Sequence, residues 1–264
     1  MGSSFSEPKG GFSVKKSVFA FVTLFILTFI AQISLAGVES LVLYLPFDEG
    51  SGDVVKDLSG SGNNGAIIGA KWVNGKVNDA LEFDGASYVD IPNSDSLSLA
   101  KDITVMAWVF MKDGTSGEMA IVSKGQWAAN DLPYELTVTP GGTIFWQMYD
   151  NAGRDSCSPP SPPTGEWHHI AATYDGTTFK CYIDGEMKQE FAYTGTLPQN
   201  TANVTVGKRS KANECYLQGM IDEVAIYSSA LSDEEVKNEM NGITIAAVNA
   251  KEKLPSLWGK IKTE

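Results

Sequence analysis

The sequence predicts an all-β fold, a two-sheet antiparallel jelly-roll sandwich with one short C-terminal helix. Short runs rich in β-branched and aromatic residues recur from about Leu41 to Tyr227, separated by turn-forming Gly, Asn, Asp and Pro. No helical segment stands between these runs, and short antiparallel strands pack as sandwiches or jelly rolls. The expected strands are residues 40–47, 101–111, 118–125, 134–139, 143–150, 167–175, 178–185, 202–208 and 219–227.

Turn-forming dipeptides predict a hairpin within this series. The stretch YDGTTFKCYIDG at 174–185 contains Asp175-Gly176 and Asp184-Gly185. Asp-Gly supplies the positive-φ positions that tight hairpin turns need. The Pro-rich stretch at 156–165 is expected to be a stiff surface loop rather than a linker between domains.

The single short helix is expected directly after the last strand. Ser232 followed three residues later by Glu235 forms a capping box. Leu231 and Val236 then form a hydrophobic staple across it, and Asn241-Gly242 ends the helix with residues that tolerate a left-handed backbone. The acidic residues of this helix are therefore explained by capping and solvent exposure.

The first residues have the layout of a targeting segment. Three lysines precede the apolar run at 17–36, and Ser34 and Ala36 supply the small residues that a signal peptidase site requires. Residues 1–36 are expected to be a secretory signal peptide cleaved before Gly37, which makes the protein secreted, periplasmic or extracellular. The alternative is an uncleaved N-terminal membrane anchor, because about 18 or more apolar residues can span a bilayer.

The net charge of the chain excludes some classes of binding partner. The 264 residues carry a formal net charge of −12, and removing the three lysines and one glutamate before Gly37 leaves −14. Such an acidic protein repels phosphate backbones and anionic membranes. We therefore expect no nucleic-acid partner and no stable membrane insertion after cleavage. The two histidines and the absence of a C-x-x-C motif exclude a structural zinc site.

Seven motifs follow one another along the chain: LYLPFDEGSG (43–52), KDLSGSGNNGAIIG (56–69), ALEFDGASYVDIPNSDSLSL (80–99), ITVMAWVF (103–110), IVSKG (121–125), EWHHIAATYDGTTFKCYIDGE (166–186) and GMIDEVAIYSSALSDEEV (219–236). In this order they resemble the LamG-like jelly-roll domains of the concanavalin A-like lectin/glucanase superfamily. The resemblance covers about Leu41 to Asn241.

The resemblance implies two curved antiparallel sheets packed face to face, often with a bound calcium, in proteins that serve adhesion or carbohydrate binding. It implies no single ligand, because the fold hosts many functions. The expected organisation is a signal peptide at 1–36, a LamG-like domain at 37–243 and a C-terminal tail at 244–264.

The adjacent acids Asp222 and Glu223 raise the question of a glycosidase active site. On a regular strand, neighbouring side chains point to opposite faces of the sheet, and such a pair cannot flank one glycosidic bond. Laminarinase-type relatives carry Glu-x-Asp-x-x-Glu on one strand, whereas this chain has Met220 and Ala225 at the outer positions. No catalytic residue is therefore assigned, and the protein is expected not to be an enzyme.

Asp222 is instead a candidate calcium ligand. Its face of the strand is otherwise apolar, so an ionised carboxylate there needs a cation or backbone donors. Asp57 and Asn63, in the loop DLSGSGNN, offer oxygens to a cation that prefers six to eight of them. The expected ligands of a structural Ca²⁺ are Asp57 and Asp222, with Asp48 and Asn63 beside them. A carboxylate held by backbone amides alone is the alternative.

Ligand binding is expected on loops. Trp127 lies between two strands, where an indole is poorly placed for the core and suited to stack on a sugar. Tyr149, Asp150 and Arg154 follow at the end of a later strand. The opposing interpretation of Trp127 is a side chain that anchors its loop. His168 and His169 are expected to be structural residues of a strand.

Three cysteines allow one disulfide bridge in an oxidising compartment. Cys181 alternates with apolar neighbours and is expected in the core, which favours Cys157–Cys215 as the bridge.

Together these features predict an exported, non-enzymatic, lectin-like module that binds a glycan. The alternatives are an adhesion domain for an extracellular or cell-surface protein, and a divergent polysaccharide hydrolase or lyase.

Overall fold

A computed structural model describes residues 2, 40–128, 130–150 and 153–242, with the side chains of 153–155 left out. Apart from Gly2, these residues belong to the compact unit Gly37–Glu264. The expected signal peptide at 1–36 and the tail at 244–264 lie outside the described residues. No helix among the residues described is long and apolar enough to cross a membrane.

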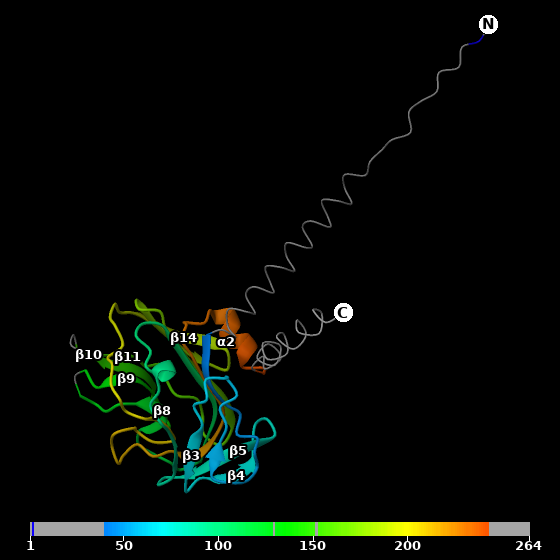
Figure 1. Cartoon of the computed structure of the whole chain (residues 1–264), viewed down its shortest axis with the longest axis vertical. Helices are drawn as coiled ribbons and strands as arrows, with labels where there is room; N and C mark the ends of the chain where they lie inside the picture. The colour runs from blue at the N-terminus through cyan, green and yellow to red at the C-terminus, as the bar shows by residue number, and fades with distance from the viewer. Residues whose placement is uncertain (1, 3–39, 129, 151–152, 243–264) are drawn as a thin grey trace, which may run out of the picture. The chain divides into compact units, whose positions relative to one another are not determined.

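Two antiparallel sheets of eight strands form this unit, as the sequence predicts (Figure 1). In sheet A the strand order is β14 (Glu186–Ala192), β13 (Thr178–Ile183), β12 (Trp167–Tyr174), β7 (Ile103–Met111), β16 (Gln218–Tyr227), β5 (Asp79–Asp84) and β4 (Lys71–Asn74), and β1 (Leu41–Leu45) also pairs with β16. In sheet B the order is β11 (Gly153–Cys157), β10 (Ile144–Asp150), β9 (Leu132–Val138), β8 (Met119–Lys124), β15 (Val204–Val206), β6 (Tyr88–Ile91), β3 (Gly65–Ile68) and β2 (Val54–Val55).

The main core lies between the inner faces of the two sheets. Along β7, Val105, Ala107 and Val109 face this core, and their strand neighbours face outward. Trp146 of β10 meets Phe179 of β13 edge to face across it, with ring centroids 6.4 Å apart. Each large apolar side chain buried in this way contributes about 1.5–3 kcal/mol. Alternation with period two is therefore the property that fixes which face of each strand is inside.

The turn between β13 and β14 shows how the expected dipeptides act. Asp184 and Gly185 have φ values of 53° and 74°, the left-handed conformation of a type I′ turn. The Asp184 carboxylate accepts a 2.9 Å bond from the His169 amide and lies 2.8 Å from His168 Nδ1. The predicted hairpin is confirmed as β12 paired with β13.

Helix α2 (Asp233–Glu239) begins with the predicted capping box. The Ser232 side chain accepts from the Glu235 amide, and the Glu235 side chain accepts from the Ser232 amide. Leu231 and Val236 are buried in a second apolar cluster on the outer face of sheet A. The helix thereby covers one end of this face, beside β14 (Figure 1).

The structure contains several strands that the sequence did not predict. Edge strand β14 is almost entirely exposed, with Met187 and Phe191 among its side chains. Its polar composition therefore resembles a loop. Strand β11 likewise overlaps the expected Pro-rich loop at Ser156 and Cys157. The other strands that the sequence did not predict are β2, β3, β4, β5 and β6.

The three cysteines carry free thiols. Cys181 is buried in the core, as predicted, and its Sγ lies 3.7 Å from the Cys157 carbonyl oxygen. Cys215 is half-buried in the loop before β16. The predicted Cys157–Cys215 bridge is therefore not formed in this structure, because Cys157 packs against β13 instead.

A buried ionic network stabilises the outer face of sheet B. Glu135 of β9 is fully buried and receives two bonds from Arg209, at 2.9 Å from Nε and 2.8 Å from Nη2. Arg209 also pairs with Glu118 at 2.9 Å and Glu214 at 2.8 Å. Neutral donors to Glu135 are Ser123 and Gln147.

We predict that Arg209→Met lowers the free energy of unfolding by about 3–5 kcal/mol, because Glu135 would remain buried without its cation. The control is Lys112→Met, which breaks the partly exposed 2.8 Å pair with Glu82 and should cost at most about 1 kcal/mol. Urea denaturation measures both. Equal losses in the two variants would contradict the assigned role of the network.

Candidate functional site

The adjacent acids in β16 lie at a β-bulge. Strand β16 pairs with β5 as far as Ile221 and with β1 from Val224 onward. Its register with β7 shifts between Asp222 and Ala225, and Glu223 has a φ of 54°. Such an extra residue is what a bulge inserts into one strand of a pair. The bulge therefore marks the point where β16 changes one of its neighbours.

The bulge corrects the expected orientation of the two carboxylates. Asp222 is directly opposite Trp108 of β7, and paired residues share a face of the sheet. Glu223 bonds to Tyr44, whose ring belongs to the outer apolar cluster, while Val224 enters the inner core. The prediction of opposite faces was wrong, because the extra residue breaks the period of two. Both acids lie on the outer face of sheet A.

Asp222 is fully buried and held by a loop. Its Oδ2 accepts bonds of 2.9 Å from the amides of Lys76 and Val77. Gly75 is needed beside it, since a Cβ there would lie 2.6 Å from Oδ2. Burial raises the pKa of Asp222 to about 7, the charge of Glu223 adds to the rise, and the amide hydrogen bonds oppose it.

Glu223 is 9% exposed and accepts a 2.6 Å bond from the Tyr44 hydroxyl. Burial raises its pKa, the bond from Tyr44 lowers it, and the charge of Asp48 raises it. Burial and the nearby carboxylates also raise the pKa of Tyr44, so that its hydroxyl stays protonated and donates.

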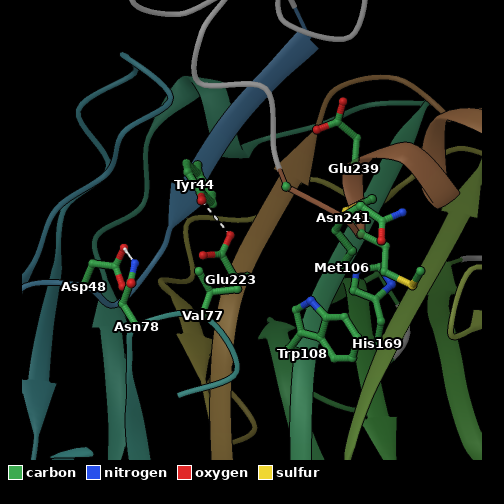
Figure 2. Close-up of a pocket in the computed structure, with 12 residues that line it drawn as sticks. Tyr44, Asp48, Val77, Asn78, Met106, Trp108, His169, Glu223, Glu239 and Asn241 are labelled. Atoms are coloured by element: carbon green, nitrogen blue, oxygen red, sulfur yellow. Dashed lines mark hydrogen bonds between the residues drawn. The ribbon is translucent and has the colours of Figure 1, made fainter. Parts of the chain in front are cut away.

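A pocket of about 270 Å³ opens in front of Glu223, and we call it the bulge pocket. Figure 2 shows Glu223 and Tyr44 on one side of it and Trp108 with His169 on the other. Asp222 is not among the lining residues, because its side chain is directed toward the amides of the 75–79 loop. The pocket is lined by Tyr44, Asp48, Val77, Asn78, Met106, Trp108, His169, Glu223, Glu239, Met240, Asn241 and Gly242.

The four expected calcium ligands divide into two groups. Asp48 and Asp222 both contact the 75–79 loop, since Asp48 accepts bonds from Asn78 Nδ2 and the Asp79 amide. Asp57 and Asn63 share no hydrogen-bond partner with Asp222. They belong to a separate network, in which Asp57 accepts four bonds, from the Tyr44 amide, the Ser59 amide and hydroxyl, and the Asn63 amide.

The fit of this region to a cation is therefore partial. Asp222 Oδ1 is buried and has no hydrogen-bond partner among the described residues, as a ligand of a cation would be. Within the described part of the chain, however, no group of three or more His, Cys, Asp or Glu side chains is arranged to hold a metal ion. Any metal site in this region would need backbone oxygen atoms as additional ligands.

The histidines differ in surroundings. His168 lies between Asp184 at 2.8 Å and Glu166 at 3.4 Å. His169 is buried in the bulge pocket and meets Trp108 edge to face, with centroids 5.4 Å apart. Burial lowers the pKa of His169 to about 4, so that its imidazole is neutral at pH 7. The sequence treated both as structural strand residues and did not anticipate that His169 lines a pocket.

The predicted loop residues Trp127 and Tyr149 come together on the outer face of sheet B. Trp127 is 49% exposed and meets Tyr149 edge to face, with ring centroids 6.5 Å apart. We call this pair the aromatic platform. Asp150 adjoins it and accepts a 2.8 Å bond from the Tyr193 hydroxyl. The backbone of Arg154 pairs with Tyr149, but its side chain lies outside the described atoms.

Backbone contacts support the loop that carries Trp127, residues 125–131, which we call the platform loop. Gly125 has a φ of 97°, and a Cβ there would lie 1.9 Å from the Asp131 carbonyl oxygen. The Gln126 amide donates to that oxygen at 2.8 Å, and the Asn130 amide donates to the Tyr149 carbonyl at 3.0 Å. These contacts hold the loop at Gln126 and at Asn130, and Trp127 need not be buried to anchor it.

In metal-free protein, Asp222→Asn should gain stability relative to the parent as the pH rises from 5 to 8. The pKa of Asp222 in the folded protein is about 7, above the value of about 3.9 in an unfolded chain. The folded state therefore keeps a proton that the unfolded state loses, and stability falls as the pH rises through this window. Asparagine keeps an acceptor for the two amides and never ionises.

Urea denaturation of both proteins in EDTA at pH 5 and pH 8 measures this change, which we expect to be roughly 1–3 kcal/mol. A stability difference independent of pH would contradict the assignment.

Solved structures with similar folds include several binding domains. The binding domain of Paraclostridial Mosquitocidal Protein 1 is 18% identical, with a TM-score of 0.62 over 77% of this chain and 52% of that chain. Domain 4 of AbnA, a GH43 extracellular arabinanase from Geobacillus stearothermophilus solved with arabinotriose, is 22% identical, with a TM-score of 0.59 over 75% and 97%. The Botulinum neurotoxin serotype D ligand binding domain, solved with N-acetylneuraminic acid, is 16% identical, with a TM-score of 0.61 over 80% and 52%.

The chain spans about half the length of the mosquitocidal and neurotoxin chains. At these identities the likeness shows a shared fold. A comparison with curated proteins returned no match. The family model Laminin_G_3, described as the Concanavalin A-like lectin/glucanases superfamily, matches residues 83–237, more than half of the sequence. Together with the two-sheet jelly roll, this match shows that the chain belongs to the concanavalin A-like lectin/glucanase superfamily.

Proposed function

We propose that the protein is an exported, non-enzymatic module that binds a glycan at the aromatic platform. The observation that carries the proposal is the half-exposed indole of Trp127, which contacts Tyr149 and lies on a loop with backbone hydrogen bonds near both of its ends. An aromatic ring in such a position offers a flat apolar surface to the C–H face of a sugar. Because the ring already packs against Tyr149, less conformational entropy is lost on ligand binding than for an unsupported side chain.

Polar groups beside the platform support the same role. Asp131, in the platform loop, accepts bonds from Lys211 Nζ at 3.0 Å and Asn200 Nδ2 at 2.9 Å. These side chains already hold one another in fixed orientations. They offer donors and acceptors to sugar hydroxyls next to an apolar surface, the combination typical of ligand sites.

Ligands of structurally similar proteins agree with a glycan. Domain 4 of AbnA was solved with arabinotriose and the serotype D domain with N-acetylneuraminic acid. Cell entry of type C neurotoxin depends on two ganglioside molecules. These carbohydrates differ in charge and linkage, so they support the ligand class and leave the particular sugar to experiment.

The positions of the two adjacent acids argue against Asp222 and Glu223 as a catalytic pair. Glu223 lines the bulge pocket, whereas Asp222 is directed into the 75–79 loop. A glycosidase needs two carboxyl groups on either side of one bond, and this pair does not face a common space. Turnover of any polysaccharide would contradict the non-enzymatic proposal.

We predict that Trp127→Ala weakens glycan binding by at least about 2 kcal/mol, or roughly 30-fold in Kd, as loss of a central aromatic contact does. A glycan array identifies the sugar, and titration calorimetry with it compares the variants. The matched control is Phe191→Ala on β14, an aromatic residue of similar exposure, which should bind as the parent does. If the protein binds no glycan on the array and an extracellular protein co-purifies with it, the adhesion alternative is favoured.

We also propose a structural Ca²⁺ near Asp222 and Asp48, supported by the unpartnered Asp222 Oδ1. EDTA should lower the melting temperature and added Ca²⁺ should restore it, since a ligand at 100 times its Kd stabilises a protein by about 2.7 kcal/mol. Asp222→Asn should abolish this response. Asp57→Ala should lower the melting temperature equally with and without Ca²⁺, because Asp57 holds a separate network. Indifference of the parent protein to EDTA and Ca²⁺ would contradict the proposal.

A further inference from the structure

The bulge pocket is anionic. Three carboxylate side chains line it, those of Asp48, Glu223 and Glu239, and no lysine or arginine is among its lining residues. Neither Asp48 nor Glu223 takes part in an ion pair between described residues. A buried carboxylate without a cation is costly unless its surroundings compensate for lost water. Glu223 therefore provides a strong local attraction for a positive charge.

Aromatic rings form the other part of the pocket. Trp108 lies opposite Glu223 across the opening, and Tyr44 stands beside Glu223 (Figure 2). The Lys76 ammonium already lies over the Trp108 ring, with Nζ 4.3 Å from its centroid. An indole face attracts cations through its quadrupole, and the position of Lys76 shows that a cation can reach this ring.

The pocket also contains a polar atom without a partner. His169 is 2% exposed and lines the pocket, and its Nδ1 makes no hydrogen bond within the described structure. Buried polar groups in proteins are nearly always satisfied, so an unsatisfied one in a pocket points to a missing ligand. A neutral imidazole adds no positive charge that would repel a cation.

We propose that the bulge pocket binds the ammonium group of a small organic cation. Glu223 would neutralise the charge, the faces of Trp108 and Tyr44 would contact the carbon atoms attached to nitrogen, and Asp48 would attract the cation to the opening. A volume of about 270 Å³ is near the lower end of the range for ligand pockets, which suits a small molecule rather than a chain segment.

This site is separate from the proposed glycan site. The bulge pocket lies on the outer face of sheet A, at the end of α2, and the aromatic platform lies on the outer face of sheet B. The two proposals can therefore fail independently.

The test is titration calorimetry of the full chain with choline and with 3,3-dimethyl-1-butanol, in which a neutral carbon replaces the nitrogen. We expect choline to bind at least about 10-fold more tightly than this neutral analogue, in EDTA and at low salt, because the charge supplies much of the affinity. Equal binding of the two compounds, or no binding of choline, would overturn the proposal.

Variants locate the site. Glu223→Gln keeps an acceptor for Tyr44 and should weaken choline binding at least about 10-fold, and Trp108→Leu should do the same. Lys76→Ala should retain or tighten binding, since it removes a competing cation from the Trp108 ring. Trp127→Ala, at the other site, should bind choline as the parent does.

Circular dichroism and the melting temperature show whether each variant folds. Unchanged choline binding in folded Glu223→Gln would overturn the proposal, as would an equal loss in Trp127→Ala. If Trp108→Leu does not fold, Trp108→Phe replaces it, and a weaker but measurable affinity is then expected because phenylalanine is the poorer cation–π partner.

Discussion

The β16 bulge determines where the polar groups of sheet A lie. Strand β16 must pair with β5 along its first half and with β1 along its second, and the extra residue at Asp222–Glu223 makes this change of neighbour. A glutamate in the left-handed region costs roughly 1–2 kcal/mol. The Tyr44 hydroxyl and the amides of the 75–79 loop offset that cost by bonding to the two carboxylates. The pocket lies in front of the bulge because no strand fills the space between β1 and β5 there.

The same sandwich presents two surfaces of different chemistry. On sheet B, Trp127 offers an exposed aromatic ring, backed by the half-buried Tyr149, next to paired polar groups. The Glu135–Arg209 network holds the strand that carries Tyr149. On sheet A, the pocket in front of Glu223 is anionic and partly buried. A neutral sugar suits the first surface and a cation suits the second. Because each lies on an outer face, the apolar core between the sheets can stay continuous.

The sequence predicted those strands that are runs of β-branched and aromatic residues between turns, as along β7, and it predicted α2 because capping is a local property. Strand β14 was not predicted, because an exposed strand at the edge of a sheet needs no apolar face and its sequence is mostly polar. Trp127 and Tyr149 were predicted individually, but their contact depends on tertiary structure. The prediction that Asp222 and Glu223 point to opposite faces was wrong because of the bulge. The spacing of the neighbouring apolar residues gives one indication of this bulge. The inner residues Ile221 and Val224 are three apart, which no regular strand allows.

The most direct test of this account is the position of the Glu223 side chain in solution. Nuclear Overhauser effects in protein labelled at glutamate and the aromatic residues report which protons lie near its γ-methylene group. We expect contacts from Glu223 to the Tyr44 ring on the outer face of sheet A. Contacts from Glu223 to the inner residues Leu81 or Ile226 would contradict it, since they would place the side chain between the sheets, on a regular strand without a bulge.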